Sequence, residues 1–164
     1  TRSARSILGP DAKHTVQTFA FRYGFFTYDG GQVKAAFEDI KAAGNPDVVF
    51  THQRDDLHQD HRIVGELTWN TFRNHLILEY EIPKYDGGLG SPSFFVPLPT
   101  DVVDAKVQGL MAHFGTQRSK RWFSEETFRG LMRLRGIECQ SESGYAEAFY
   151  CRKVVLQSGG KQGA

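Results

Sequence analysis

The chain has 164 residues, of which 40% are hydrophobic and 13% aromatic, so it is long enough for one domain with a substantial core. Its 20 basic and 19 acidic residues leave a net charge of +1, which gives no electrostatic reason to expect a nucleic-acid partner. No apolar run is long enough for a membrane span, and Cys139 and Cys151 fit neither a metal-binding spacing nor a disulfide framework, which favours a cytoplasmic protein with free thiols.

The first residues have the pattern of a helix end. Ile7 and Leu8 are apolar, Gly9 can end a helix and Pro10 cannot continue one. Because a chain rarely begins inside a helix, we expect the intact protein to contain residues that precede Thr1.

The first half of the chain alternates between strand and helix patterns. A strand followed by an aromatic loop is expected first, then an amphipathic helix with apolar residues at i, i+4 and i+7, a short buried strand, a second amphipathic helix and another strand. These elements cover residues 14–26, 33–44, 48–50, 62–75 and 76–82.

The second half is predicted to contain a long loop rich in Gly and Pro, a short strand within it, two helices and a terminal strand. Their ranges are 83–99, 94–96, 101–114, 124–136 and 144–156. The alternation of helices and strands predicts an α/β fold of Rossmann-like type, with a mostly parallel sheet and helices on both faces. The polar, Gly-rich residues 157–164 are expected to form a flexible tail.

Residues 51–62, THQRDDLHQDHR, contain three histidines and three aspartates directly after the predicted strand 48–50. In open α/β sheets, ligands bind at the carboxyl ends of the strands. His58 and His61 are three residues apart, so in a helical turn they share a face, and Asp60 lies between them. Two imidazoles beside a carboxylate can bind a divalent metal, or one can bind the metal while the other donates a proton.

Simpler explanations exist for single residues of this stretch. Asp56 can be only a helix N-cap, and Arg62 only a solvated charge. A catalytic zinc also needs three protein ligands, and this stretch supplies one or two. The combination at a strand-to-helix junction nevertheless favours a functional site, with metal binding as the leading hypothesis.

The segment PDVVFTHQRDDLHQDHR resembles the second signature of the PIG-L / LmbE-like zinc-dependent N-deacetylases, in which a P-D-(V/I)-(V/I) strand precedes a D-x-H-x-D-H segment. Three further blocks resemble that family in the same order: EIPKYDG, KVQGLMAHFGTQ, and RGIEC with YAEAFYCRK. The resemblance therefore extends over nearly the whole chain.

This resemblance implies a Rossmann-like fold and a Zn²⁺ site that hydrolyses an acetamide on a sugar. It implies that His61 is a zinc ligand, that His58 stabilises the oxyanion or protonates the leaving amine, and that Asp60 orients one of the histidines. The family's first signature, H-P-D-D-E, supplies the other ligands and the general base, and it does not occur in this chain. Residues 1–156 would then be the C-terminal two-thirds of one deacetylase domain, with the N-terminal strand and helix upstream, in roughly 50–80 further residues.

Four further residues are candidates for substrate contact. His52 directly follows the strand and can line the pocket or make a structural hydrogen bond, and Asp56 lies next to the imidazoles. Tyr85 and Asp86 lie in the long loop, where an aromatic face and a carboxylate suit a sugar, although the glycine pair that follows them equally suggests a mobile lid.

Two residues outside these blocks have open roles. His113, beside apolar residues of a helix, is expected to be a hydrogen-bonded core or interface histidine. Glu147 can reach the rim of the pocket or pair with an arginine.

The sequence thus leaves three functions open. The first is an N-deacetylase acting on an N-acetylated sugar or sugar conjugate, with Zn²⁺ as cofactor. The alternatives are a non-catalytic interaction module of the same fold, and another divalent-metal hydrolase. Neither a nucleic-acid partner nor a membrane span is expected, and homo-oligomerisation remains open.

Overall fold

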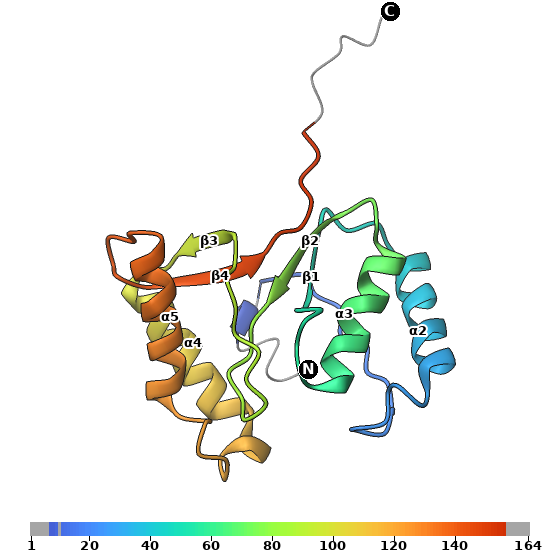
Figure 1. Cartoon of the computed structure of the whole chain (residues 1–164), viewed down its shortest axis with the longest axis horizontal. Coiled ribbons are helices and arrows are strands. Elements are labelled where there is room, and N and C mark those ends of the chain that lie inside the picture. Colours follow the sequence, from blue (N-terminus) through green and yellow to red (C-terminus); the bar gives the residue numbers. More distant parts are fainter. Residues whose placement is uncertain (1–6, 10, 157–164) are drawn as a thin grey trace, which may run out of the picture.

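A computed structural model describes residues 7–9 and 11–156, so the predicted tail 157–164 lies outside the described residues. A four-stranded sheet stands between two groups of helices (Figure 1). In chain order the elements are α2 (Gly30–Ala42), β1 (Val48–His52), α3 (Gln59–Thr71), β2 (Leu76–Tyr80), β3 (Phe94–Pro97), α4 (Thr100–His113), the 3₁₀ turn η1 (Gly115–Gln117), α5 (Glu125–Glu138) and β4 (Ala146–Tyr150).

The strand order is β1-β2-β4-β3. Strands β1 and β2 are parallel, whereas β4 is antiparallel to both of its neighbours. The predicted α/β class is therefore confirmed, but the parallel arrangement is limited to the β1–β2 pair. After β2 the chain continues in a long loop to β3 instead of a helix that returns to a parallel strand. The strand that follows α5, β4, then lies between β2 and β3 and is antiparallel to both.

Two helices pack directly on strands of the sheet. On one face, α3 packs on β1, where the hydroxyls of Thr51 and Thr68 are 2.8 Å apart. The strand register places Ala148 on this same face, and α5 packs on β4. Glu147 alternates with Ala148 and points to the other face, where Lys106 of α4 pairs with it.

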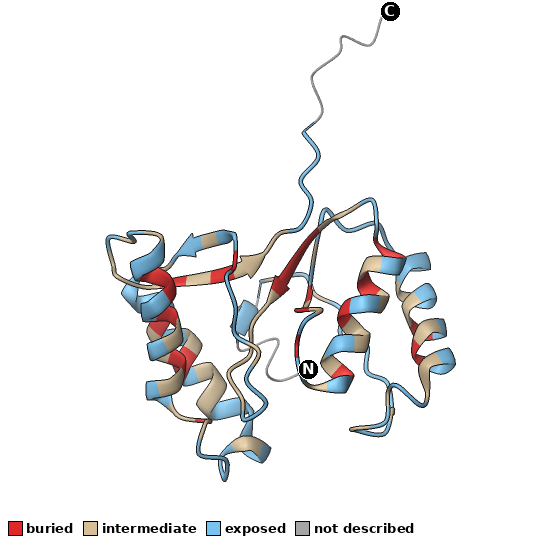
Figure 2. Ribbon diagram, viewed as in Figure 1, coloured by how far each residue is buried: buried red, intermediate tan, exposed pale blue. Residues whose placement is uncertain are grey.

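The buried apolar side chains of the described residues lie on α2 and at the end of α3, in β2 and β4, and between α4 and α5 (Figure 2). The cluster between the two helices consists of Val103, Val107, Phe123, Phe128 and Met132. Ser124, the first residue of the predicted helix range, is the N-cap of α5, because its side-chain oxygen accepts the Thr127 N–H at 3.2 Å.

The segment before α2 differs from the sequence prediction. Residues 14–26 form no strand, so that prediction is wrong. Its aromatic rings pack on one another instead, with Phe21 stacked on Phe19 and edge-on to Phe26. The predicted helix end is confirmed at residues 7–9, where Ile7 and Leu8 are helical and Gly9 has φ +85°. The predicted helix residues 1–6 lie outside the described residues.

Strand β1 lies at an edge of the sheet, with β2 as its neighbour. Phe50, in the middle of β1, is 58% exposed, and its ring lies 5.5 Å from that of Phe149 in β4. The sequence predicts a fully buried strand here, whereas the structure shows one face of β1 open to solvent. Among the described helices, none combines the length and apolar character that crossing a bilayer requires.

Candidate metal centre

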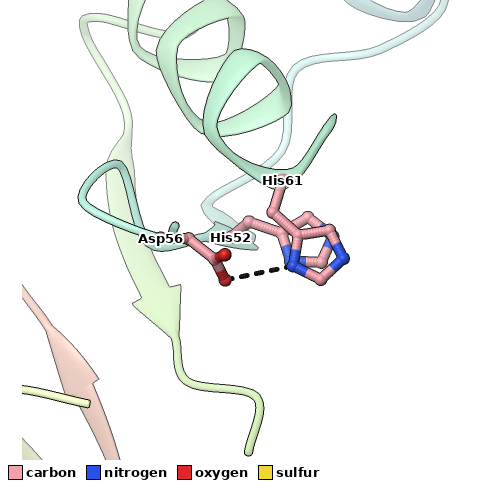
Figure 3. Close-up of side chains that lie close together, drawn as sticks. All are labelled: His52, Asp56 and His61. Carbon is pink, nitrogen blue, oxygen red and sulfur yellow. Dashed lines mark hydrogen bonds and ion pairs between the residues drawn. The ribbon is translucent and has the colours of Figure 1, made fainter. Parts of the chain in front are cut away.

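Four residues of the 51–62 stretch meet at the carboxyl end of β1. His52 is the last residue of the strand, Asp56 lies in the following turn, His58 directly precedes α3, and His61 lies in its first turn. Figure 3 shows His52, Asp56 and His61 with their side chains converging. One potential ligand atom from each of these three lies within 4.8 Å of the other two.

His61 is oriented by Asp56. Its Nδ1 lies 3.0 Å from the Asp56 Oδ2, and a carboxylate oxygen can only accept, so Nδ1 carries the proton (Figure 3). The other nitrogen, Nε2, then keeps its lone pair while the ring is neutral. Burial lowers the pKa of His61 despite the opposing effect of Asp56, which favours the neutral ring. This is the carboxylate–histidine arrangement that supports a metal ligand.

The Asp56 carboxylate is saturated with hydrogen bonds. Besides His61, it accepts the backbone N–H of His58 at 2.8 Å and the Lys84 ammonium at 2.8 Å. Burial would raise the pKa of Asp56, but the hydrogen bonds from Lys84, His58 and His61 outweigh it and hold the pKa below its usual value. Asp56 is therefore ionised and acts as the orienting group. Lys84 was missed from the sequence, since one lysine before a loop carries no signal.

His52 lies directly against His61. The two rings are stacked with centroids 4.0 Å apart, and Tyr80 packs edge-on to His52. The His52 Nδ1 is buried and has no hydrogen-bond partner among the described residues. Burial, together with the neighbouring His61, lowers the pKa of His52 to about 4. The sequence predicts substrate contact for His52, and the geometry makes it a second candidate ligand.

Acid should destabilise the metal-free protein through His52. The unfolded chain protonates this histidine near pH 6.5, whereas the folded protein resists protonation down to about pH 4. The stabilisation is complete above pH 6.5 and is lost as the pH falls toward 4, by about 1–2 kcal/mol between pH 7 and pH 5. Urea unfolding across this range should show a shallower pH dependence in His52→Gln than in the unmodified protein. His113→Gln removes an exposed imidazole and is the control; an unchanged slope in His52→Gln would contradict the assignment.

His58 forms a separate pair with a residue that the sequence did not indicate. Its Nε2 lies 2.8 Å from the Tyr23 hydroxyl, and its ring centroid is 4.6 Å from that of His61. The Nδ1 of His58 is buried and unpartnered within the described part of the chain. Tyr23 belongs to the aromatic loop before α2, and nothing in its local sequence distinguishes it from the other aromatic residues there.

Asp60 does not contact a histidine, so the predicted orienting role belongs to Asp56. The Asp60 carboxylate, which is buried, accepts the backbone N–H groups of Gly24 at 2.6 Å and Phe26 at 3.2 Å. It thereby fixes the loop that carries Tyr23. Asp60 acts on His58 only indirectly, by placing the Tyr23 hydroxyl.

Replacing Asp60 with alanine should therefore loosen this loop. Two backbone N–H groups lose a charged acceptor, and we expect a loss of about 2–4 kcal/mol in the free energy of unfolding, measured in urea. Asp55→Ala, an exposed aspartate of the same stretch, is the matched control and should change stability by less than about 0.5 kcal/mol. Equal effects of the two substitutions would show that the loop is held by other contacts.

A cavity of about 400 Å³ opens beside His58 and His61. Tyr85 and Asp86, the loop residues for which the sequence predicts substrate contact, line this cavity, and both are exposed. Glu147 also reaches the cavity, where its partner is a lysine of α4 rather than an arginine.

His113, the residue of α4 that the sequence analysis singled out, lies outside this cavity. His113 is exposed at the end of the helix and does not line the cavity, so of the two predicted environments, core or interface, the core is excluded.

Two side chains of the site are suited to bind a divalent metal, whereas the third is not. His52 and His61 offer two neutral imidazoles, and the buried, unpartnered nitrogen of His52 is the kind of atom that a ligand would satisfy. Asp56 is less suited to direct coordination, because its Oδ2 already accepts both His61 and Lys84. A three-ligand catalytic zinc therefore needs a further donor besides the two imidazoles.

The described chain is an open α/β domain with an imidazole–carboxylate cluster at the carboxyl end of its edge strand. No protein-family profile matches it, and no curated protein is similar to it in sequence. Among solved structures, it is similar to the crystal structure of the conserved protein TT1542 from Thermus thermophilus, with a TM-score of 0.64 and 20% identity. The match covers 84% of this chain and 65% of the TT1542 chain, and at this identity it shows the fold alone.

Proposed function

We propose that this protein is a zinc-dependent hydrolase that removes an N-acetyl or other N-acyl group from a substrate that contains an amino sugar. The observation that carries the proposal is the Asp56–His61 pair, because it aims a neutral imidazole nitrogen away from the carboxylate, next to His52. The resemblance of this stretch to the PIG-L / LmbE-like deacetylases supports the same reaction.

In the proposed reaction, His61 and His52 would hold the zinc, which when bound polarises an amide carbonyl and lowers the pKa of water. The water oxygen joins the carbonyl carbon, the C–N bond breaks, and the two protons of the water end on the amine, so that a carboxylate and a protonated amine are released. His58 is placed to donate that proton or to stabilise the oxyanion, with Tyr23 hydrogen-bonded to its Nε2. Lys84 keeps Asp56 ionised, so that His61 holds its orientation.

Exposed residues of the cavity support the proposed substrate, and the free thiols support the proposed compartment. Tyr85 and Asp86 offer an aromatic face and a carboxylate to an N-acetylated sugar or sugar conjugate. Cys139 and Cys151 are both free, which supports a reducing compartment such as the cytoplasm.

Amine release from N-acetylglucosamine conjugates tests the proposal directly. The chain should bind Zn²⁺, and activity should appear with Zn²⁺ and disappear with a chelator. Because the two imidazoles need a further donor, we expect zinc to bind substoichiometrically. Zinc binding without any amide hydrolysis would favour a non-catalytic module, and phosphate-ester cleavage with Mn²⁺ would favour a different metal hydrolase.

A further inference from the structure

The cavity beside the imidazoles is larger and more apolar than an acetyl group requires. Its volume of about 400 Å³ is enough for roughly a dozen water-sized groups. An acetyl group bound at His58 and His61 would fill a small part of it. The remainder therefore has to accommodate another part of the substrate.

One part of the lining, the apolar wall, comes from α4, α5 and the segment between them. It is made largely of aliphatic and aromatic side chains, among them Leu110, Phe114, Trp122, Leu131 and Met132. Two of these, Leu110 and Trp122, also pack against the apolar core between the helices, which fixes the shape of the wall. Such a surface binds apolar groups by removing them from water.

Two ion pairs line the cavity, whereas the exposed side chains of Asp86 and Lys120 have no ion-pair partner among the described residues. Lys106 is paired with Glu147, and Arg135 with Glu81. Apolar side chains make up the larger part of the lining, and apolar surface is buried most favourably against an apolar group.

The loop after β2 contributes Tyr85 and Asp86 to the lining. Tyr85 and Asp86 are exposed, and the Tyr85 hydroxyl accepts the backbone N–H of Arg121 at 2.9 Å. This bond ties the loop after β2 to the segment between α4 and α5, above the apolar wall. A hydrophilic sugar therefore fits the exposed mouth.

We infer that the acyl group removed at this site is an apolar chain of about four to eight carbons, which occupies the cavity while the amino sugar stays at the mouth. The inference rests on the proposed function, because it assigns the two sides of the same amide bond. The scissile carbonyl lies between His58 and His61, the acyl chain points toward Leu110 and Leu131, and the amine points toward Tyr85.

A series of N-acyl glucosamines with two, four, six, eight and ten carbons tests this assignment on the unmodified, zinc-supplied protein. We expect kcat/KM to rise about fourfold with each added methylene until the cavity is full, and then to level off or fall. A value that is highest for acetyl and falls with chain length would overturn the inference.

Binding provides a measurement that does not depend on turnover. In calorimetric titrations, N-hexanoylglucosamine should bind at least about tenfold more tightly than N-acetylglucosamine. If it does but no amide is hydrolysed, the chain-length inference stands and the proposed function fails. Equal affinities for the two compounds would overturn the inference even if acetyl is hydrolysed.

Two matched substitutions on α4 locate the chain-binding wall. Leu110→Trp fills the cavity and should reduce the ratio of hexanoyl to acetyl binding by about tenfold or more. Val102→Trp adds the same side chain at a 44% exposed position outside the cavity and should leave the ratio unchanged. If Leu110→Trp is poorly folded, Leu131→Trp on α5 serves the same purpose. An unchanged ratio in the folded cavity variant would place the acyl chain elsewhere.

Discussion

Replacing His61 with alanine is expected to remove zinc binding and amide hydrolysis together. His61 is the imidazole that Asp56 orients, with Nδ1 on the carboxylate and Nε2 free for a metal. Loss of an outer-shell partner alone typically lowers metal affinity about 10–100-fold, so loss of the ligand itself should exceed about a hundredfold. Metal content and amine release, measured on the same samples, test this expectation.

The control for this substitution is His113→Ala, which removes an exposed histidine far from the cluster in sequence. It should keep both zinc and activity. Tight, one-to-one zinc binding that survives His61→Ala would show that the metal is held by other residues, and the proposed site would be wrong.

His58→Ala should separate proton transfer from metal binding. The His58 ring lies beside that of His61, but its Nε2 is hydrogen-bonded to the Tyr23 hydroxyl and Asp56 accepts only its backbone N–H. We therefore expect zinc content to be unchanged and kcat to fall by about 10²–10⁴-fold, the usual effect of removing a positioned acid or oxyanion donor.

Either of two results would change the role assigned to His58. If His58→Ala removes the zinc, His58 is a ligand and the proton donor is another residue of the site. If the variant keeps both zinc and rate, the side chain is structural. Tyr23→Phe complements the test, because it removes the hydroxyl that contacts His58 and leaves the ring in place.

Much of the fold could be predicted because the helices carry clear apolar periodicity and recognisable ends. Ser124 at the start of α5 and Gly9 at the end of the first helical residues are examples in which local chemistry sets the boundary. The antiparallel position of β4 could not be predicted, because strand order depends on packing between α5 and the sheet rather than on a local pattern. The phenylalanines of the aromatic loop before α2 have strand propensity, so sequence alone favours a strand there. In the structure two backbone N–H groups of this loop donate to the Asp60 carboxylate and not to a neighbouring strand.

Sequence alone could predict only those residues of the candidate site that lie close together along the chain. His52, Asp56, His58 and His61 lie within ten residues, so sequence alone could place them at one edge of the sheet. Lys84 contacts Asp56 from 28 positions away along the chain. Such a contact depends on the path of a long loop, and so does the contact of Tyr23 with His58.

The open edge of β1 has a consequence for how metal binding and strand pairing influence each other. Within residues 7–9 and 11–156, no strand pairs with the outer edge of β1. Such an edge can accept a further extended segment, and a strand that pairs with it in parallel would end beside His52 and His61. A donor atom at that end would join the two imidazoles. Metal binding and strand addition would then be linked equilibria, in which each raises the affinity for the other by the same factor. Bound zinc would stabilise the added strand, and the side chains of that strand would lie beside the exposed ring of Phe50.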